Sequence, residues 1–342
     1  MRNGTDTIAV LILVTSVVRG LSANEPSEAD KSSCLADAAR AAIVRSLPLL
    51  EKGTQGSAEQ RKCFTCHNQT LPMLALVEAR KRGFTIDEDN FTRQLDHTVA
   101  HLKRGQKNYL DGEGLGGKVV TAGYALWALE VGGWTPDETT AAVTGYLLKY
   151  QQDASHWTHP SSRPPSTGSE FMTTFVALRG LQKFGTQQQQ VEIEARKKQV
   201  RQWILAEKPA ELEDHVFRLW TLPYMDVDEE TLGTQTAKLV NQQREDGGWA
   251  QKSEMNSDAY ATGTSLVVLL EIAGLRVEHS AIQRGIKYLL HTQQKDGSWQ
   301  VVSRAKPFQT YYETGFPHGK DQFISIAASS WATLALLLTL SP

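Results

Sequence analysis

The chain has little cysteine and no strong excess of charge of either sign. Its 342 residues include three cysteines, Cys34, Cys63 and Cys66, which are too few for a disulfide framework. The formal net charge is −2 and no basic cluster occurs, so nothing in the sequence indicates binding to nucleic acid. With 40% apolar residues, the chain is long enough for one large hydrophobic core or two small ones.

Long apolar runs are equally scarce. Ile8–Val18 is too short to span a bilayer and is typical of a secretory signal peptide, so residues 1–23 are predicted to be one. An uncleaved anchor or a mis-started frame is the alternative. Residues 24–35 are polar and are predicted to form a tether. The other run, Ile324–Leu340, contains serines and threonines and is predicted to be a buried core helix. We therefore expect an exported, periplasmic protein with no stable membrane span after signal cleavage.

The sequence does contain a repeated helix ending that leads to a tryptophan. The fullest copy is RGIKYLLHTQQKDGSW, residues 284–299, and weaker copies end at Trp249 and at Trp157, where Ser155 replaces the usual glycine. The turns lie near residues 151–157, 243–249 and 293–299. The tryptophans are 92 and 50 positions apart, and a period of 46 to 50 indicates stacked two-helix units. A single copy could be an ordinary helix C-cap, but three in near-register favour a repeat.

Hydrophobic periodicity predicts twelve helices in which amphipathic and mostly apolar segments alternate. A helix that is apolar on most sides must be buried, whereas a striped helix covers a core from outside. Six inner and six outer helices fit a closed all-α (α/α)6 toroid over residues 36–342. An open solenoid is the alternative, but it would need a polar last helix. The predicted outer helices are 37–51, 87–107, 136–151, 190–207, 228–243 and 279–293, and the inner ones are 67–83, 118–131, 169–184, 214–222, 257–273 and 321–340.

These repeats match the QW pattern of squalene and hopene cyclases, and the predicted ring resembles the single toroid of the terpenoid cyclase and protein prenyltransferase superfamily. The resemblance extends over nearly the whole mature chain and implies an all-α toroid. The run from Ser257 to Gly263 also resembles a group of bacterial exported proteins described as squalene cyclase-like or prenyltransferase-like. Some of those proteins carry a CxxCH motif near the N-terminus.

The sharpest short motif is Cys63-Phe64-Thr65-Cys66-His67. Two thiols at this spacing can form thioethers to the two vinyl groups of a haem, and the next histidine can bind the iron. We therefore expect one covalent haem c on Cys63 and Cys66 with His67 as the proximal ligand. A dithiol redox pair, a disulfide or half of a zinc site are the alternatives. A zinc site would need further ligands, and the sequence has no second cysteine pair.

The second axial ligand of such an iron is left open by the sequence. Because the motif precedes a predicted inner helix, it should lie on the rim where the N-termini of the inner helices gather. The candidates are one of several methionines, one histidine, or no sixth ligand at all. The side chains considered are Met73, Met172, Met255 and His318.

Asp258 is the candidate acid. In the resembling cyclases that protonate an alkene, an Asp-x-Asp-Asp run stands at an inner-helix start, and the matching stretch here, residues 256–262, has one carboxylate. A lone aspartate there can cap the helix as well as donate a proton. In the resembling prenyltransferases the first zinc ligand would match Asp258, but Tyr260 stands where their cysteine would be and a histidine is missing near residues 322–325. No zinc is expected.

Aromatic residues on the predicted inner helices suit the walls of a cavity for an isoprenoid, with plain core packing as the alternative. The residues concerned are Trp127, Phe175, Trp220, Tyr260 and Phe323. Three functions are compatible with these features. The first, favoured for the site, is electron transfer by a haem-bearing toroid, with an apolar small molecule or a redox protein as partner. The second is a terpenoid cyclase or lyase with Asp258 as acid, and the third is a non-catalytic isoprenoid- or lipid-binding toroid. Catalysis is left open.

Overall fold

A computed structural model describes Met1 and residues 28–159, 163–307 and 310–341. Apart from Met1, the predicted signal peptide lies outside the described residues, and so does the start of the predicted tether. The tether prediction differs from the structure beyond that point, because helix α1 already begins at Glu28. The sequence from Glu28 to Leu47 contains neither glycine nor proline, so nothing in it prevents helix formation.

The structure confirms all twelve predicted helices. The outer helices are α1 (Glu28–Gln60), α3 (Glu88–Arg104), α6 (Glu138–Lys149), α8 (Gln190–Ala206), α10 (Glu229–Val240) and α12 (Ser280–Thr292). The inner helices are α2 (Leu71–Lys81), α5 (Lys118–Val131), α7 (Glu170–Phe184), α9 (Leu212–Thr221), α11 (Ala259–Glu271) and α13 (Gln322–Leu338). The sequence did not predict the short helix α4 (Gln106–Leu110) or four one-turn helices, which are η1 (Cys66–Thr70), η2 (Gln187–Gln189), η3 (Leu222–Met225) and η4 (Gly319–Asp321).

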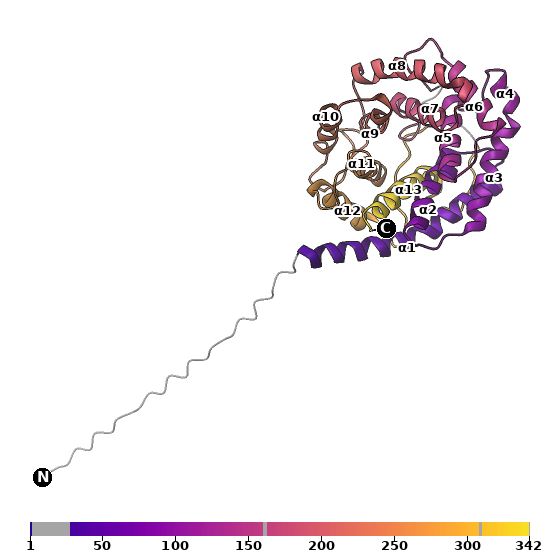
Figure 1. Cartoon of the computed structure of the whole chain (residues 1–342). Coiled ribbons are helices and arrows are strands. Elements are labelled where there is room, and N and C mark those ends of the chain that lie inside the picture. The colour runs from indigo at the N-terminus through magenta and orange to yellow at the C-terminus, as the bar shows by residue number, and fades with distance from the viewer. Residues whose placement is uncertain (2–27, 160–162, 308–309, 342) are drawn as a thin grey trace.

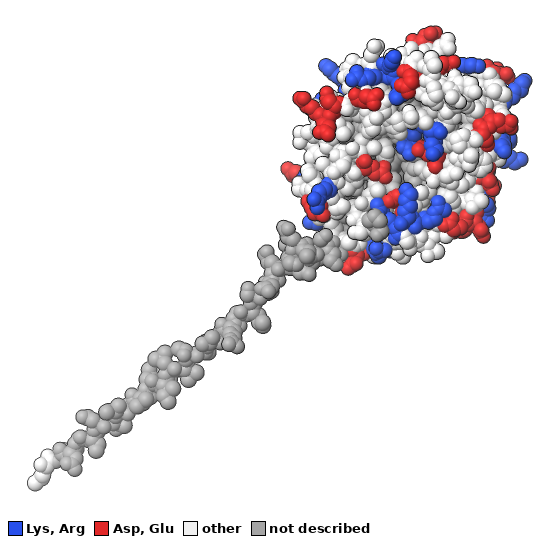
Figure 2. Space-filling model, in the orientation of Figure 1, with Lys and Arg blue, Asp and Glu red and all other residues white. Residues whose placement is uncertain are grey.

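The inner helices form a closed ring, as Figure 1 shows. Each packs against the next in chain order, and α13 returns to pack against α2. The first outer helix, α1, packs against both α12 and α13, so the ring closes where the first and last helices meet, and the predicted closed toroid is confirmed. One helix of the described residues, Gly319–Leu338, is long and apolar enough to cross a membrane, but 83% of its most apolar stretch is buried. It is a core helix, as predicted. Lysine, arginine, aspartate and glutamate lie side by side on the face seen in Figure 2.

The glutamine of the fullest repeat joins the two ends of the ring. The Gln293 side-chain amide donates to the carbonyl of Gly297 in its own turn and to the carbonyl of Ala42 in α1, both at 2.9 Å. Its oxygen accepts a hydrogen bond from Arg45, also in α1. Gly297 has a φ of +94°, the left-handed region that a glycine adopts without strain.

Gln243 makes the same joint one repeat earlier. Its amide donates to the carbonyls of Gly247 and Ala281, both at 2.8 Å, and its oxygen accepts from Arg284. Each glutamine therefore fastens its own turn to the following outer helix, and at the end of the chain the following outer helix is α1.

The repeat tryptophans fold back onto the helices that precede them and are almost completely buried. Each indole N–H donates to the backbone carbonyl of the residue ten positions earlier, which satisfies a polar group that would otherwise be costly to bury. The pairs are Trp157 with Leu147 (2.9 Å), Trp249 with Leu239 (2.9 Å) and Trp299 with Leu289 (2.8 Å).

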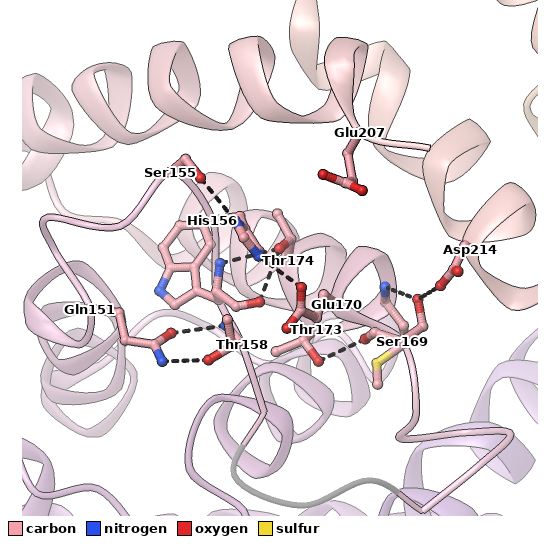
Figure 3. Close-up of polar contacts among 12 residues, drawn as sticks. Gln151, Ser155, His156, Thr158, Ser169, Glu170, Thr173, Thr174, Glu207 and Asp214 are labelled. Carbon is pink, nitrogen blue, oxygen red and sulfur yellow. Dashed lines mark hydrogen bonds and ion pairs between the residues drawn. The ribbon is translucent and has the colours of Figure 1, made fainter. Parts of the chain in front are cut away.

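The copy at Trp157 makes its outer joint by different chemistry. Gln151 exchanges two hydrogen bonds with Thr158 (Figure 3), and among the described residues it makes no bridging contact of the kind seen at Gln293. Arg196 of α8 makes the bridge instead, because its guanidinium donates to the carbonyls of Gln152 and Ala154 and lies over the Trp157 ring, 4.0 Å from its centre.

Aromatic side chains fill the middle of the ring. The Trp127 ring lies 5.3 Å from Phe175, 6.0 Å from Trp220 and 6.1 Å from Trp331, measured between ring centres. All four side chains are buried. Three of the residues that were expected to line a cavity therefore pack against one another, because facing inner helices bring their largest side chains to the same level. Phe323 is half-buried and packs on Tyr312.

Candidate active site at the rim of the ring

The polar residues singled out in the sequence meet where several inner helices begin. A small cleft there is lined by the first residues of α9 and α11 and by the connections that precede α7 and α13. Its volume is about 10 Å³, which is enough for about one water molecule. Its lining residues are Pro165, Glu211, Leu212, Glu213, Gln251, Tyr260, Ala261, Thr264 and Arg304.

Asp258 is the N-cap of α11, and the repeat turn before it sets its position. The Asp258 backbone N–H donates to the carbonyl of Trp249 at 3.0 Å. One carboxyl oxygen accepts from the backbone N–H of Ala261 at 2.9 Å, and the other accepts from the side-chain amide of Gln251 at 3.0 Å. Burial raises the pKa of Asp258 to about 6 and outweighs these hydrogen bonds, which act in the opposite direction.

Glu213, in the first turn of α9, is a second carboxyl of the rim, and the sequence did not reveal it. The Tyr260 hydroxyl donates to its Oε1 at 2.9 Å, and both side chains are buried. Burial raises the pKa of Glu213 well above its usual value, although the bond from Tyr260 acts to lower it. Burial also raises the pKa of Tyr260 well above its usual value. Burial therefore favours the protonated form of both side chains.

Glu213 was missed because acidic residues in the first turn of a helix usually offset its dipole. Its neighbour Asp214 fills that role, because it accepts hydrogen bonds from the backbone N–H groups of Ala210 and Glu211 and from the Ser169 hydroxyl, the last of which is drawn in Figure 3. One sequence feature could have pointed to Glu213. It is a second acid beside Asp214 at the start of a helix that is otherwise mostly apolar.

Arg304 also lines the cleft. Its guanidinium contacts both carboxyl oxygens of Glu211, at 3.0 and 3.1 Å, and donates to the Gln251 side-chain oxygen at 3.1 Å. This bond orients the Gln251 amide so that its N–H group points to Asp258.

The Cys63–His67 motif lies at the same rim, as predicted. Cys66 is close enough to Glu213 for that carboxyl to act on its thiol, and burial raises the pKa of Cys66 to about 12. The Cys66 sulfur is 3.3 Å from His67 Nδ1, and the other ring nitrogen, Nε2, is 2.6 Å from the Ser166 hydroxyl. Burial lowers the pKa of His67 to about 4. Cys63 is exposed.

These residues have the type and order that a haem c needs, but this conformation does not fit one. The nitrogen that would bind iron is hydrogen-bonded to Ser166, and one thiol is exposed while the other is desolvated. Within the part of the chain that the structure describes, no three His, Cys, Asp or Glu side chains are arranged to hold a metal ion. Covalent haem stays a prediction of the motif, and we derive no reaction step through it.

The candidate second ligands lie in different surroundings. Met73 and Met172 are fully buried in the core of α2 and α7, and Met255 is partly buried in the turn before α11. His318 Nε2 is 2.7 Å from the Ser298 hydroxyl. The structure brings two other histidines to the motif, because their i, i+4 spacing places them on one face of α3. His97 Nε2 is 3.2 Å from the Cys63 carbonyl oxygen, and the His101 ring stacks on Phe64.

Comparison with known proteins identifies the scaffold. Residues 218–337, which include the last four residues of α9, helices α10 to α12 and all but the last residue of α13, match the family model of the squalene-hopene cyclase C-terminal domain. The chain is terpenoid cyclase-like. A squalene–hopene cyclase from Bradyrhizobium diazoefficiens is 30% identical over 106 residues, which is 26% of this chain and 15% of that protein. The match thus spans a small part of that relative's length.

The terpenoid cyclase-like chain also shares its fold with a solved structure. That structure is a type II terpene cyclase from Scytonema in complex with its substrate, geranylgeranyl dihydroxybenzoate. The TM-score is 0.54 at 10% sequence identity, and the match covers 90% of this chain and 99% of the other. At this identity the likeness shows a common all-α toroid, which confirms the predicted fold class.

Proposed function

We propose that this terpenoid cyclase-like ring is an enzyme that protonates an isoprenoid-type alkene with a carboxyl of its rim. The observation that carries the proposal is the pair of desolvated acids, Asp258 and Glu213, at neighbouring inner-helix starts. A carboxyl with a raised pKa keeps its proton to a higher pH than an exposed carboxyl does, so it is better suited to act as a general acid. The substrate of the Scytonema cyclase and the squalene-hopene relatives support an isoprenoid as ligand.

The proposed reaction differs from cyclisation of a long chain inside the ring. Ligand pockets for molecules of that size are hundreds of cubic ångströms in volume. Trp127, Phe175, Trp220 and Trp331 pack against one another where such a pocket would lie. We therefore place the chemistry at the rim, on one end of the substrate.

The protonation step balances with groups of the rim alone. A carboxyl gives its proton to one carbon of the double bond and becomes a carboxylate, and the other carbon becomes a cation. Loss of a proton from an adjacent carbon back to that carboxylate then gives an isomerised alkene and restores the acid. The face of the Tyr260 ring and the carboxylate stabilise the cation.

Turnover of purified protein with squalene and with geranylgeraniol, followed by gas chromatography, tests this function. We expect wild-type protein to convert at least one of the two, and the double variant D258N/E213Q to lose about 10²- to 10⁴-fold in rate, the usual contribution of a general acid. D228N is the matched control, because Asp228 makes the same kind of cap on the outer helix α10 and is not among the residues that line the cleft. No conversion by wild type, or equal rates in all three proteins, would reject the proposal.

The CxxCH motif supports a second candidate, a haem c attached at the same rim after export. The observation in its favour is the CxxCH order itself, which directly precedes the inner helix α2, although Ser166 would have to leave His67 Nε2. Protein produced with a haem-attachment system should then show a Soret band and a covalent mass gain of one haem. Both should be lost in C63A/C66A and kept in C34A, since Cys34 is outside the motif. A colourless wild type of unmodified mass would exclude the haem.

A further inference from the structure

Which of the two rim carboxyls gives up the proton follows from what each is already bonded to. Both carboxyl oxygens of Asp258 accept hydrogen bonds, one from the α11 backbone and one from Gln251. Gln251 cannot turn its amide round without losing its bond from Arg304. Two N–H donors aimed at one carboxyl favour its ionised form and leave it poorly placed to donate.

Glu213 accepts a bond at one carboxyl oxygen, from the Tyr260 hydroxyl, and no backbone N–H of the described residues donates to it. Its neighbour Asp214 carries out the capping of α9. The cleft is lined by Glu213 and by Tyr260, whereas Asp258 is not among its lining residues. A substrate end that enters the cleft therefore meets Glu213 first.

The position of Tyr260 strengthens this assignment. In this chain the residue two places after Asp258 is a tyrosine, and its hydroxyl lies at the inner-helix start where the resembling cyclases carry further acids. Glu213 reaches that hydroxyl from the neighbouring inner helix α9. Helix α9 thus supplies the carboxyl at the cleft, and helix α11 supplies the hydroxyl that is hydrogen-bonded to it.

From this geometry we infer that Glu213 is the proton donor of the rim site, that Tyr260 positions its carboxyl, and that Asp258 serves as the cap of α11. The inference rests on the proposed function. Glu213 transfers its proton to the alkene carbon, and the resulting carboxylate accepts the proton that the cation loses from an adjacent carbon. Neither a metal nor a redox partner is needed.

Rates of E213Q, D258N and Y260F with the substrate that wild type converts test the assignment. We expect E213Q to lose at least about 100-fold in kcat, Y260F to lose less, and D258N to lose less than about tenfold. E213D should recover part of the loss, because it restores an acid on a shorter side chain. Circular dichroism and thermal unfolding confirm that each variant is folded, and D228N again serves as the unchanged control.

The pH dependence gives an independent signature. A general acid must be protonated, so the rate falls as pH rises through its pKa. With Glu213 as donor, wild type keeps its rate above pH 6, because burial holds the pKa of that carboxyl well above its usual range. A rate that instead falls through the Asp258 pKa of about 6 would assign the proton to Asp258.

Infrared spectroscopy provides a readout that does not depend on turnover. At neutral pH, the carbonyl band of a protonated carboxyl should be present in wild type and D258N and absent from E213Q. A band that persists in E213Q and is lost in D258N, or turnover that D258N abolishes and E213Q keeps, would overturn the assignment while leaving the proposed function in place. Failure of wild type to convert any substrate would overturn both, even if the band confirmed a neutral Glu213.

Discussion

Replacing Gly297 by alanine is expected to lower the free energy of unfolding by about 2–5 kcal/mol. A non-glycine residue with left-handed backbone geometry costs roughly 1–2 kcal/mol, and Gly297 has a φ of +94°. A Cβ there would also lie 2.5 Å from the carbonyl oxygen of Arg45 and 2.7 Å from its carbonyl carbon. These are backbone atoms of α1, so α1 would have to move away at the joint that closes the ring, and overpacking of this kind costs about 1–3 kcal/mol.

Gly274 provides the matched control for that substitution. It also has a positive φ, +65°, but a Cβ there would meet nothing within 4 Å. G274A should therefore cost only the backbone strain, about 1 kcal/mol. Urea unfolding of both variants measures the difference. Equal losses in the two proteins would mean that α1 does not sit against the last repeat turn in solution, and the closed ring would be in error.

Replacing Trp331 by alanine should cost about 3–5 kcal/mol, because it removes a large side chain from the filled centre of the ring and leaves a cavity. Trp331 is 1% exposed and contacts Trp127. The W331A cavity should be apolar and should bind a small hydrophobic molecule such as benzene, which raises the melting temperature by mass action.

Phenylalanine at the same position gives the comparison. Among the described residues, the indole nitrogen of Trp331 is buried without a hydrogen-bond partner, so W331F removes a polar atom that is costly to bury. We expect W331F to be more stable than W331A by at least about 2 kcal/mol, measured by thermal unfolding with and without benzene. A W331A protein as stable as wild type would show that the centre of the ring is open rather than packed.

The helices and their order could be predicted from the sequence because periodicity records which face of a helix is buried. The repeat turns were predictable for a related reason. In the turns at Gln243 and Gln293, the glutamine side chain donates to the carbonyl of the positive-φ glycine four positions later, so these contacts lie within a short stretch of sequence that ends at the tryptophan. The joint at Trp157 could not be predicted, because Arg196, which makes it, belongs to the next helix and to no local pattern.

The site could be predicted only in part. Asp258 stands out because a cap residue at the start of an inner helix has a local sequence signature, and the structure places it there. Glu213 has none, since its role depends on Tyr260, which is 47 positions away and is brought to it only by the packing of α9 against α11. The aromatic residues were predicted to line a cavity because periodicity shows that they point inward. It does not show how much space is left when they meet.

Deuterium incorporation from solvent is the most direct test of rim protonation. Wild-type protein is incubated in D2O with the isoprenoid it converts, and the product is examined by mass spectrometry. When the protein is equilibrated in D2O before the substrate is added, the rim carboxyl carries deuterium, and we predict one carbon-bound deuterium in each product molecule of the first turnover. A product without deuterium would contradict protonation of the substrate by the rim carboxyls.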